Sequence, residues 1–551
     1  MMRSLILCAT VVALGVGCDA RNTSAAAATK PPDTAAPGRK PELQLRWHFQ
    51  GAGQLAGDTN ASLLRQVLTL PATRRVMEDA LQKLARAPRT LRPGGQAAAT
   101  ADLAPRVRPM LDDLLHAESV GLCRTEAGKM PEWTLAVRLD DARAGLWRTN
   151  WSEALAALGA VPSAGSQTGA DASWEAPQPS TPSRFRLSRS GGWMVIGWGD
   201  KPLAQLAEVL GEIKAGGRPK AAASQGWFDL DAHLPYWANS LGWPANVRWP
   251  QAEIGVAGRG ANLRTTMRLT FPAPLGITLE PWKIPTNTIR EPLISFTALQ
   301  GVGPWLAGQD WIRALGMKPI PNQIYGWALA DSPFQTYYTW RSPDATNRLP
   351  QMAPLIMPLI KTNFPQLVTG AFTWLPATAQ LSWDGMPFLV PFMRPASAPE
   401  SDFLVAGVFP TSGTTNRHLA PAALYAQVTS KTNLVFYDWE ITENRVRDWQ
   451  NLGAFYNLAA RYKAQAADGA GFLWLTDTNV SRRLGNTVTE VTWTSPRELS
   501  VVRSGSVGLT GFELMSLARW LDNPAFPGYR APQRIAKPAK GAKEAPAPHT
   551  P

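Results

Sequence analysis

An internal repeat is the feature that most constrains the fold. Residues 43–57 read LQLRWHFQGAGQLAG, and residues 293–308 read LISFTALQGVGPWLAG. Each copy is an apolar strand followed by Gln-Gly-x-Gly and then Leu-Ala-Gly, and Gly301 stands 250 residues after Gly51. The elements expected after each copy come in a similar order, so the sequence predicts a duplicated architecture.

Hydrophobic periodicity predicts groups of strands and helices in both halves of the chain. Short connections between strands, such as Ser190-Gly191-Gly192, favour antiparallel pairing. We therefore expect an α+β fold of two related lobes, residues 43–290 and 291–529, each a mainly antiparallel sheet with helices packed on one face. Helical periodicity covers residues 61–85, 103–118, 142–158, 202–214, 304–315, 351–361, 442–462 and 511–521. The proline-rich stretch 280–285 is the predicted junction of the lobes.

Residues 1–18 have the features of a signal peptide. A short apolar run follows Arg3 and ends at Gly17-Cys18. The segment resembles a bacterial lipoprotein signal, although Gly15 stands where such signals usually carry leucine. The resemblance implies that Cys18 is lipidated and that the mature chain is membrane-anchored in the cell envelope, on its periplasmic or extracellular face. Ordinary signal cleavage nearby and an uncleaved anchor are the alternatives, and the run is short for a membrane span.

Two segments near the ends of the chain have the composition of disordered chain. Residues 19–42 are rich in Ala, Thr and Pro and predict a tether. Residues 530–551 carry five basic residues and one acidic residue, and the whole chain has a formal net charge of +13. Outside the cytoplasm, such a basic tail suits lipid headgroups, anionic envelope polymers or acidic protein surfaces, and no nucleic-acid partner is expected. A solubilising role of the tail is the alternative.

The chain holds 23 tryptophans and three cysteines. Trp147 and Trp151 share one face of a predicted helix, whereas Trp193 and Trp198 lie on opposite faces of a predicted strand. Packing within and between the lobes is the favoured role of the tryptophans, and stacking on sugars is the alternative. Cys123, the one cysteine outside the signal segment, is predicted to be a small buried hydrophobe.

The strand 435–440, which reads VFYDWE, contains the best candidates for catalysis. Asp438 and Glu440 alternate along it, so both carboxyl groups face the same side and one can raise the pKa of the other. The segment superficially resembles the Asp-x-Glu strand motif of family-18 chitinases, but Phe436 and Leu434 stand where that motif needs further acidic residues. A strand end that leads into a helix cap is the alternative.

Other chemistries find no support in the sequence. Gly301-Val302-Gly303 has the setting of a dinucleotide fingerprint but lacks its third glycine, and Pro304 suits the start of a helix. No P-loop or Gly-x-Ser-x-Gly motif is present, and the histidines have no spacing typical of metal ligands. The histidines of the two lobes are His48, His116, His233 and His418. The sequence therefore predicts neither a cofactor nor a bound metal.

Four short blocks resemble a group of large uncharacterised bacterial envelope proteins. This resemblance brings no site residue with it, because that group has no established activity. The blocks are residues 114–119, 292–298, 433–440 and 509–514. The anchor, the repeat and the lack of a catalytic constellation predict a non-enzymatic, lipid-anchored envelope protein that binds a protein or polymer partner. The alternative is an envelope glycan hydrolase that uses Asp438 and Glu440.

Overall fold

The structure is a computed structural model that describes residues 42–528, except for residues 91–101, 127–128, 158, 164–170, 177–182, 201, 224–225, 241–242, 244–246, 331–334, 364–369, 385–389, 410–417 and 460–468. The predicted signal with Cys18, the tether up to residue 41 and the basic tail from residue 530 lie outside the described residues. Within the described residues, no helix has both the length and the apolar character needed to cross a membrane.

The described chain is mixed α+β, and its strands form one sheet of twenty strands. The first ten strands are β1 (Glu42–Phe49), β2 (Ser119–Thr125), β3 (Glu132–Arg138), β4 (Val161–Pro162), β5 (Asp171–Ala176), β6 (Ser183–Ser190), β7 (Trp193–Gly199), β8 (Phe228–His233), β9 (Gln251–Arg259) and β10 (Asn262–Thr270). The second ten are β11 (Leu293–Gln300), β12 (Gln323–Leu329), β13 (Thr336–Arg341), β14 (Ala371–Leu375), β15 (Gln380–Asp384), β16 (Phe392–Pro395), β17 (Phe403–Gly407), β18 (Leu434–Ile441), β19 (Asn486–Ser495) and β20 (Glu498–Gly505).

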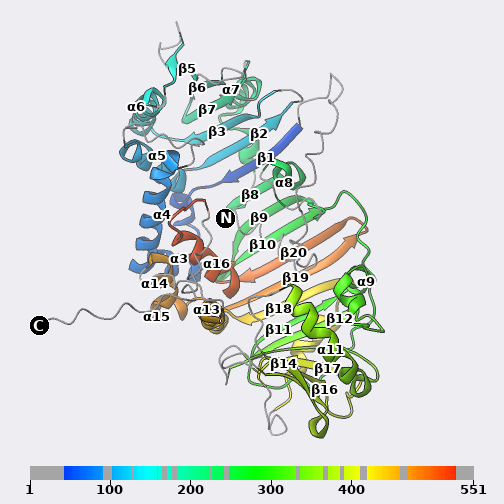
Figure 1. Cartoon of the computed structure of the whole chain (residues 1–551). Coiled ribbons are helices and arrows are strands. Elements are labelled where there is room, and N and C mark those ends of the chain that lie inside the picture. Colours follow the sequence, from blue (N-terminus) through cyan, green and yellow to red (C-terminus); the bar gives the residue numbers. More distant parts are fainter. Residues whose placement is uncertain are drawn as a thin grey trace, which may run out of the picture.

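Every strand pairing among the described residues is antiparallel, and the sequence predicted mainly antiparallel sheets. From edge to edge the order is β4-β5-β6-β7-β3-β2-β1-β8-β9-β10-β20-β19-β18-β11-β12-β13-β17-β16-β15-β14. Figure 1 shows β10 and β20 side by side in the middle of this sheet. The pairings among β1 to β10 recur among β11 to β20 with each strand number raised by ten.

The turn that follows β1 has the same backbone conformation as the turn that follows β11. Gly51 has φ +87° and Gly301 has φ +80°, which is the region that side chains with a Cβ rarely adopt. A Cβ on Gly51 would lie 2.5 Å from the backbone of Ala117, and one on Gly301 would lie 2.7 Å from Cγ2 of Ile277. The repeated glycine therefore serves a tight turn in both halves.

The register of pairing also matches between the halves. We call two residues counterparts when they occupy the same place in the strand pairing of the two halves; Ala298 in β11, for example, is the counterpart of His48 in β1. Followed from strand to strand, this register makes Val502 in β20 the counterpart of Thr266 in β10. These two counterparts pair directly with each other at the centre of the sheet.

Helices lie between and beside the strands. The helices of the first half are α2 (Ala52–Leu55), α3 (Ser62–Thr69), α4 (Pro71–Thr90), α5 (Ala104–His116), α6 (Asp141–Ala157), α7 (Ala204–Gly216), the short helix η1 (Lys220–Ala223) and α8 (Leu234–Ser240). Those of the second half are α9 (Gly303–Ala307), α10 (Asp310–Ala314), α11 (Ala345–Asn363), η2 (Pro376–Thr378), α12 (Ala422–Thr429), α13 (Thr442–Ala459), α14 (Ala470–Thr476), α15 (Thr478–Ser481) and α16 (Gly511–Leu521).

Helices cover both faces of the sheet around β7, and not one face only as the sequence predicted. Val195 packs in one core with Leu206 of α7, whereas the neighbouring Met194 packs with Trp147 of α6 on the opposite side. The prediction missed this because the number of covered faces depends on whether a strand is apolar on one side or on both sides, and not on the number of helices. Nearly every residue of β7 is buried, as in strands covered on both faces.

A helical bundle also connects the two halves. Val76 of α4 and Leu514 of α16 belong to one buried cluster. The indole N–H of Trp474 in α14 donates to Oγ1 of Thr73 in α4 at 2.9 Å. Figure 1 shows α4, α14, α13 and α16 grouped along one side of the sheet. The two halves therefore share both a sheet and a helical core.

Two predicted helices are divided in the structure. The helix predicted over 61–85 is broken at Leu70. Pro71 has no amide hydrogen to donate, and it starts a new helix. The predicted helix 304–315 is two short helices that are separated after Gly308. In both cases apolar residues of the predicted helix still face the protein interior. The hydrophobic pattern therefore predicted which face is buried, but it did not predict that the helix is interrupted.

Candidate functional site

The two predicted carboxyl groups lie on the same face of β18, beneath α16. The Thr297 hydroxyl in β11 donates to Oδ1 of Asp438 at 2.6 Å. The amide of Gly511, the first residue of α16, donates to Oε1 of Glu440 at 2.7 Å. Asp438 is partly buried, and Glu440 is only 4 % exposed. We call this side of the central strands the bundle face, because α16 packs on it.

These carboxyl groups belong to a buried charge cluster that we define as Asp438, Glu440, Arg445, Arg503 and Glu513. Arg503 of β20 is 2 % exposed and donates from Nη1 to both carboxylate oxygens of Glu513, at 3.0 and 2.8 Å. The same arginine donates from Nε to Oγ1 of Thr489 at 2.9 Å. Glu513 also accepts from the amide of Thr510 at 2.7 Å, which completes a capping box at the start of α16.

Burial changes the proton affinity of the two predicted carboxyl groups. Burial and the nearby charge of Asp438 raise the pKa of Glu440 to about 8, although the Gly511 amide and Arg445 oppose the change. Burial also raises the pKa of Asp438, against the hydrogen bond from Thr297 and the charge of Arg445. Glu440 therefore carries a proton at neutral pH and is accommodated as a neutral group.

The position of Glu440 suits a structural role better than acid–base chemistry. A catalytic pair must bring both carboxyl groups within hydrogen-bond reach of a substrate. Here the start of α16 lies over Glu440, and the Gly511 amide occupies its Oε1. The residues after Glu440 begin a helix at Thr442, which agrees with the strand-to-helix alternative seen in the sequence.

The remaining residues singled out by the sequence lie in structural positions. Cys123 is fully buried, and burial raises its pKa to about 12. Trp147 and Trp151 pack in one cluster, and Trp193 and Trp198 lie on opposite faces of β7. Among the described residues, no group of three His, Cys, Asp or Glu side chains is arranged to hold a metal ion.

Sequence reasoning missed a polar pocket on the opposite face of the central strands, which we call the trough face. Its cavity volume is about 510 Å³. It is lined by residues of β1, β8, β9, β10 and β20 together with the start of η1, which are Arg46, His48, Lys220, Ala221, Asp229, Leu230, Asp231, Glu253, Ile254, Gly255, Thr266, Met267, Arg268 and Ser500. The available signal was the polar alternation within residues 262–270, although no local pattern shows which strands lie beside it.

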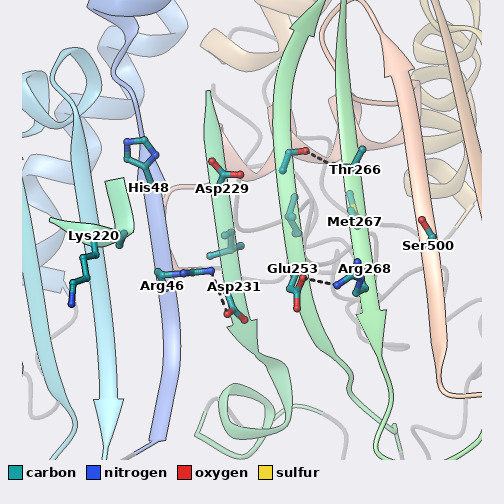
Figure 2. Close-up of a pocket in the computed structure, with 14 residues that line it drawn as sticks. Arg46, His48, Lys220, Asp229, Asp231, Glu253, Thr266, Met267, Arg268 and Ser500 are labelled. Carbon is teal, nitrogen blue, oxygen red and sulfur yellow. Dashed lines mark hydrogen bonds and ion pairs between the residues drawn. The ribbon is translucent and has the colours of Figure 1, made fainter. Parts of the chain in front are cut away.

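The charged residues of the pocket form a row across four neighbouring strands. In register, Arg46 lies opposite Asp231, Asp231 opposite Glu253, and Glu253 opposite Arg268. Figure 2 shows these four side chains in line. Nη2 of Arg46 is 3.8 Å from Oδ2 of Asp231, and Nη1 of Arg268 is 3.5 Å from Oε2 of Glu253. The row has two carboxylates side by side between two guanidinium groups.

A second row lies beside the first and contains His48, Asp229 and Thr266 (Figure 2). Gly255 occupies the place between Asp229 and Thr266 in this row. A Cβ there would lie 3.2 Å from Oγ1 of Thr266 and 3.5 Å from Oδ1 of Asp229. Even a single Cβ would therefore be in close contact with the Thr266 hydroxyl, so glycine fits this place between the carboxylate and the hydroxyl.

His48 is the most buried ionisable group of this pocket. It is 2 % exposed, and its Nε2 lies 3.1 Å from Oε1 of Glu118. Its Nδ1 is buried and has no hydrogen-bond partner. Burial alone would raise the pKa of Glu118, but the hydrogen bond with His48 and the charge of Arg138 lower it below the usual range. Glu118 is therefore a carboxylate that orients one side of the imidazole.

Each polar cluster has apolar counterparts in the other half. The trough residues Arg46, His48, Asp229, Asp231 and Glu253 correspond to Phe296, Ala298, Tyr437, Trp439 and Val488, which pack in an aromatic core with α12. The bundle-face residues Asp438, Glu440, Thr489 and Arg503 correspond to Leu230, Ala232, Ile254 and Met267, which pack in an apolar core. The common sheet architecture requires neither cluster, since apolar residues fill the same places.

The chain matches no protein-family model, no curated protein and no solved structure.

Proposed function

We propose that this chain is a non-enzymatic, lipid-anchored protein of the bacterial cell envelope that binds a partner on the trough face. The partner is a protein or an envelope polymer. The lipoprotein-like segment ending at Cys18 supports the location. The pocket between β1 and β20 supports the binding role.

One observation carries the binding proposal: the pocket is polar and open where the other half is apolar and covered. The counterparts of the pocket residues form an apolar core beneath α12. The same sheet can therefore carry apolar residues at these places. Charged side chains that stay accessible in a concave surface are the groups that fix the orientation of a ligand. The side chains of Arg46 and Arg268 are 50 % and 59 % exposed, which leaves both available to a partner.

We further propose that residues 43–290 and 291–529 are related lobes that arose by duplication. The matching order of strand pairing and the glycine turns at Gly51 and Gly301 support this relation. The pairing of Thr266 with its counterpart Val502 supports a two-fold arrangement of the lobes about the β10–β20 pair. In this proposal one lobe kept an apolar trough face, and the other diverged into the pocket.

Site-specific photocrosslinking in native cells tests the binding proposal. A photoreactive residue replaces Ser500, which lines the pocket, and a matched one replaces Thr373 on the exposed part of the edge strand β14. We expect a discrete, reproducible crosslinked species from position 500 and none of that mass from position 373. Equal products from both positions, or none from position 500 in folded protein, contradict a partner on the trough face.

Cys18→Ala tests the anchor. The variant is expected to accumulate as unprocessed precursor or to leave the membrane fraction, because the lipid would be its attachment. The measurement is membrane fractionation with metabolic labelling by a fatty acid. Unchanged fractionation and unchanged processing of Cys18→Ala would exclude the lipoprotein assignment.

The glycan-hydrolase alternative has one observation in its favour. The raised pKa of Glu440, about 8, is a property of general acids that must hold a proton at neutral pH. The burial of Glu440 under α16 opposes this role. Incubation of the chain and of Asp438→Asn with envelope glycans separates the two functions. Hydrolysis that Asp438→Asn abolishes would establish the enzyme and contradict the non-enzymatic proposal.

A further inference from the structure

The trough pocket places two carboxylates directly opposite each other between two arginines, and Asp231 also accepts from Nε2 of Gln251 at 3.2 Å. Asp231 of β8 and Glu253 of β9 lie directly opposite each other, and Asp229 lies two residues away on the same face. Carboxylates placed directly opposite on neighbouring strands repel each other and destabilise a sheet. The flanking arginines reach them only at 3.8 and 3.5 Å, which is beyond good hydrogen-bond geometry. A cation placed between the two carboxylates would relieve this repulsion.

The cation that fits is an organic ammonium group rather than a metal ion. The three carboxylates line one cavity, but no three acidic, His or Cys side chains of the described residues are close enough to ligate a metal together. An alkylammonium is larger, and it donates hydrogen bonds to carboxylates spread over a wider area. The cavity, with a volume of about 510 Å³, gives room for its alkyl chain.

The two guanidinium groups can also pair with a negative charge in the same ligand, and Nε of Arg268 lies 3.9 Å from Oε1 of Glu498 as well. Neighbouring strands are about 4.8 Å apart, so the midpoint between β8 and β9 lies roughly 7 Å from the strands of Arg46 and Arg268. Each arginine side chain is at least half exposed and retains donors for a carboxylate. In the second row, Nδ1 of His48 is buried and has no hydrogen-bond partner, so it adds a polar atom to the lining of the pocket.

We propose that the trough pocket binds a zwitterion whose ammonium and carboxylate groups are separated by an alkyl chain, as in an ω-amino acid or a lysine side chain with a free carboxylate. The ammonium lies between Asp231 and Glu253, and the carboxylate pairs with Arg268 or Arg46. This ligand class rests on the binding role proposed for the trough face. It deepens that role by naming the chemistry that the partner presents there.

Calorimetric titration of the full-length chain in mild detergent at low salt tests the ligand class. The probes are 6-aminohexanoate, Nα-acetyl-lysine, glycine, hexanoate and hexylamine. We expect 6-aminohexanoate and Nα-acetyl-lysine to bind about tenfold more tightly than the other three, because only they carry both charges at a suitable separation. Binding should weaken with added salt, because the charged side chains are partly exposed.

Single substitutions locate the bound ligand. Glu253→Gln and Arg268→Gln should each weaken 6-aminohexanoate about tenfold, since each removes one of the two charges that the ligand needs. Glu153→Gln, in an exposed ion pair with Arg106 on α6, is the matched control and should bind as the parent does. The side chains of Glu253 and Arg268 are 49 % and 59 % exposed, so these variants are expected to fold.

The other outcomes overturn the ligand class. Hexylamine that binds as tightly as 6-aminohexanoate would make the pocket a simple cation site, and the lack of binding by any probe would contradict a zwitterion site altogether. Continued crosslinking from position 500 in either case would leave the trough-face partner intact and reject only its proposed chemistry. Loss of that crosslinking as well would reject the proposed function itself.

Discussion

Arg503 shows how one residue organises the interior of the second half. Its guanidinium group is 2 % exposed and neutralises Glu513, whose carboxylate in turn holds the first turn of α16. Its counterpart Met267 occupies the same place in an apolar core. A buried ion pair stabilises little compared with apolar packing, but removal of one partner leaves a buried charge. The position of α16 therefore depends on the buried ion pair between Arg503 and Glu513.

Arg503→Met should destabilise the protein by about 3–5 kcal/mol, because Glu513 loses the partner of its buried charge. Adding Glu513→Gln should recover much of that loss, since the second change removes the unpaired charge. Urea unfolding of both single variants and of the double variant measures the coupling. Strictly additive losses would show that the two side chains act independently.

The protonated Glu440 predicts a dependence of stability on pH. Folding raises the pKa of Glu440 from 4.5 to about 8, so its favourable contribution is complete below the ordinary pKa and is lost as the pH rises through 8. The free energy of unfolding should fall by about 3–4 kcal/mol between pH 5 and 8 from this group.

Glu440→Gln tests that dependence, because glutamine keeps the shape of the protonated acid without its titration. Urea unfolding at several pH values should show a much smaller change for this variant over the same range. Glu498→Gln, a more exposed carboxyl on β20, is the control and should keep the parent slope. A Glu440→Gln variant that follows the parent curve would mean that Glu440 is ionised in the folded protein.

At the scale of elements, the glycine turns after β1 and β11 decide how the following chain leaves the sheet. Gly51→Ala should cost about 1–3 kcal/mol, since alanine is strained at positive φ and its Cβ would meet the backbone of Ala117. Gly211→Ala in α7 is the control, because a Cβ there meets no atom within 4 Å and alanine favours a helix. Thermal unfolding of both variants measures the difference, and equal midpoints would contradict a constrained turn.

The last helix shows what an element's own sequence determines. α16 covers Gly511–Leu521, the range that its periodicity and flanking residues predict. The buried stripe, however, contains Glu513, Leu514 and Met515, whereas Phe512 is 37 % exposed. The ion pair with Arg503 compensates the burial of the charged Glu513.

At the scale of the whole molecule, the β10–β20 pair makes one sheet of both halves. Val501 of β20 is buried on the bundle face with Met267, and Val502 lies on the trough face. The helical bundle adds a second connection through Val76 and Leu514. The two halves should therefore unfold together.

Val501→Ala should lower the stability of the whole molecule by about 2 kcal/mol, because it leaves a cavity at the central seam. Tryptophan fluorescence and far-UV circular dichroism should report one coincident transition in both the parent and the variant. Val502→Ala, the neighbouring change on the opposite and more exposed face, is the control and should have a smaller effect. Separate transitions by the two probes would show that the halves are independent.

The sequence by itself determined the features that depend on near neighbours. Helix Gly511–Leu521 has the predicted bounds, and the short connection Ser190-Gly191-Gly192 joins two antiparallel strands as predicted. Alternation also predicted that Asp438 and Glu440 share a face, because side chains in a strand point to alternate sides. These properties are set within a few residues along the chain.

The tertiary structure alone decided which distant residues meet. Arg46 and Asp231 come from strands far apart in the chain, and only the register of β1 with β8 makes them neighbours. The same long-range pairing places Arg503 beneath α16 and leaves Glu440 only 4 % exposed. Strand alternation names the face of a residue but not the strand beside it, so the trough pocket and the buried charge cluster are products of sheet order and register.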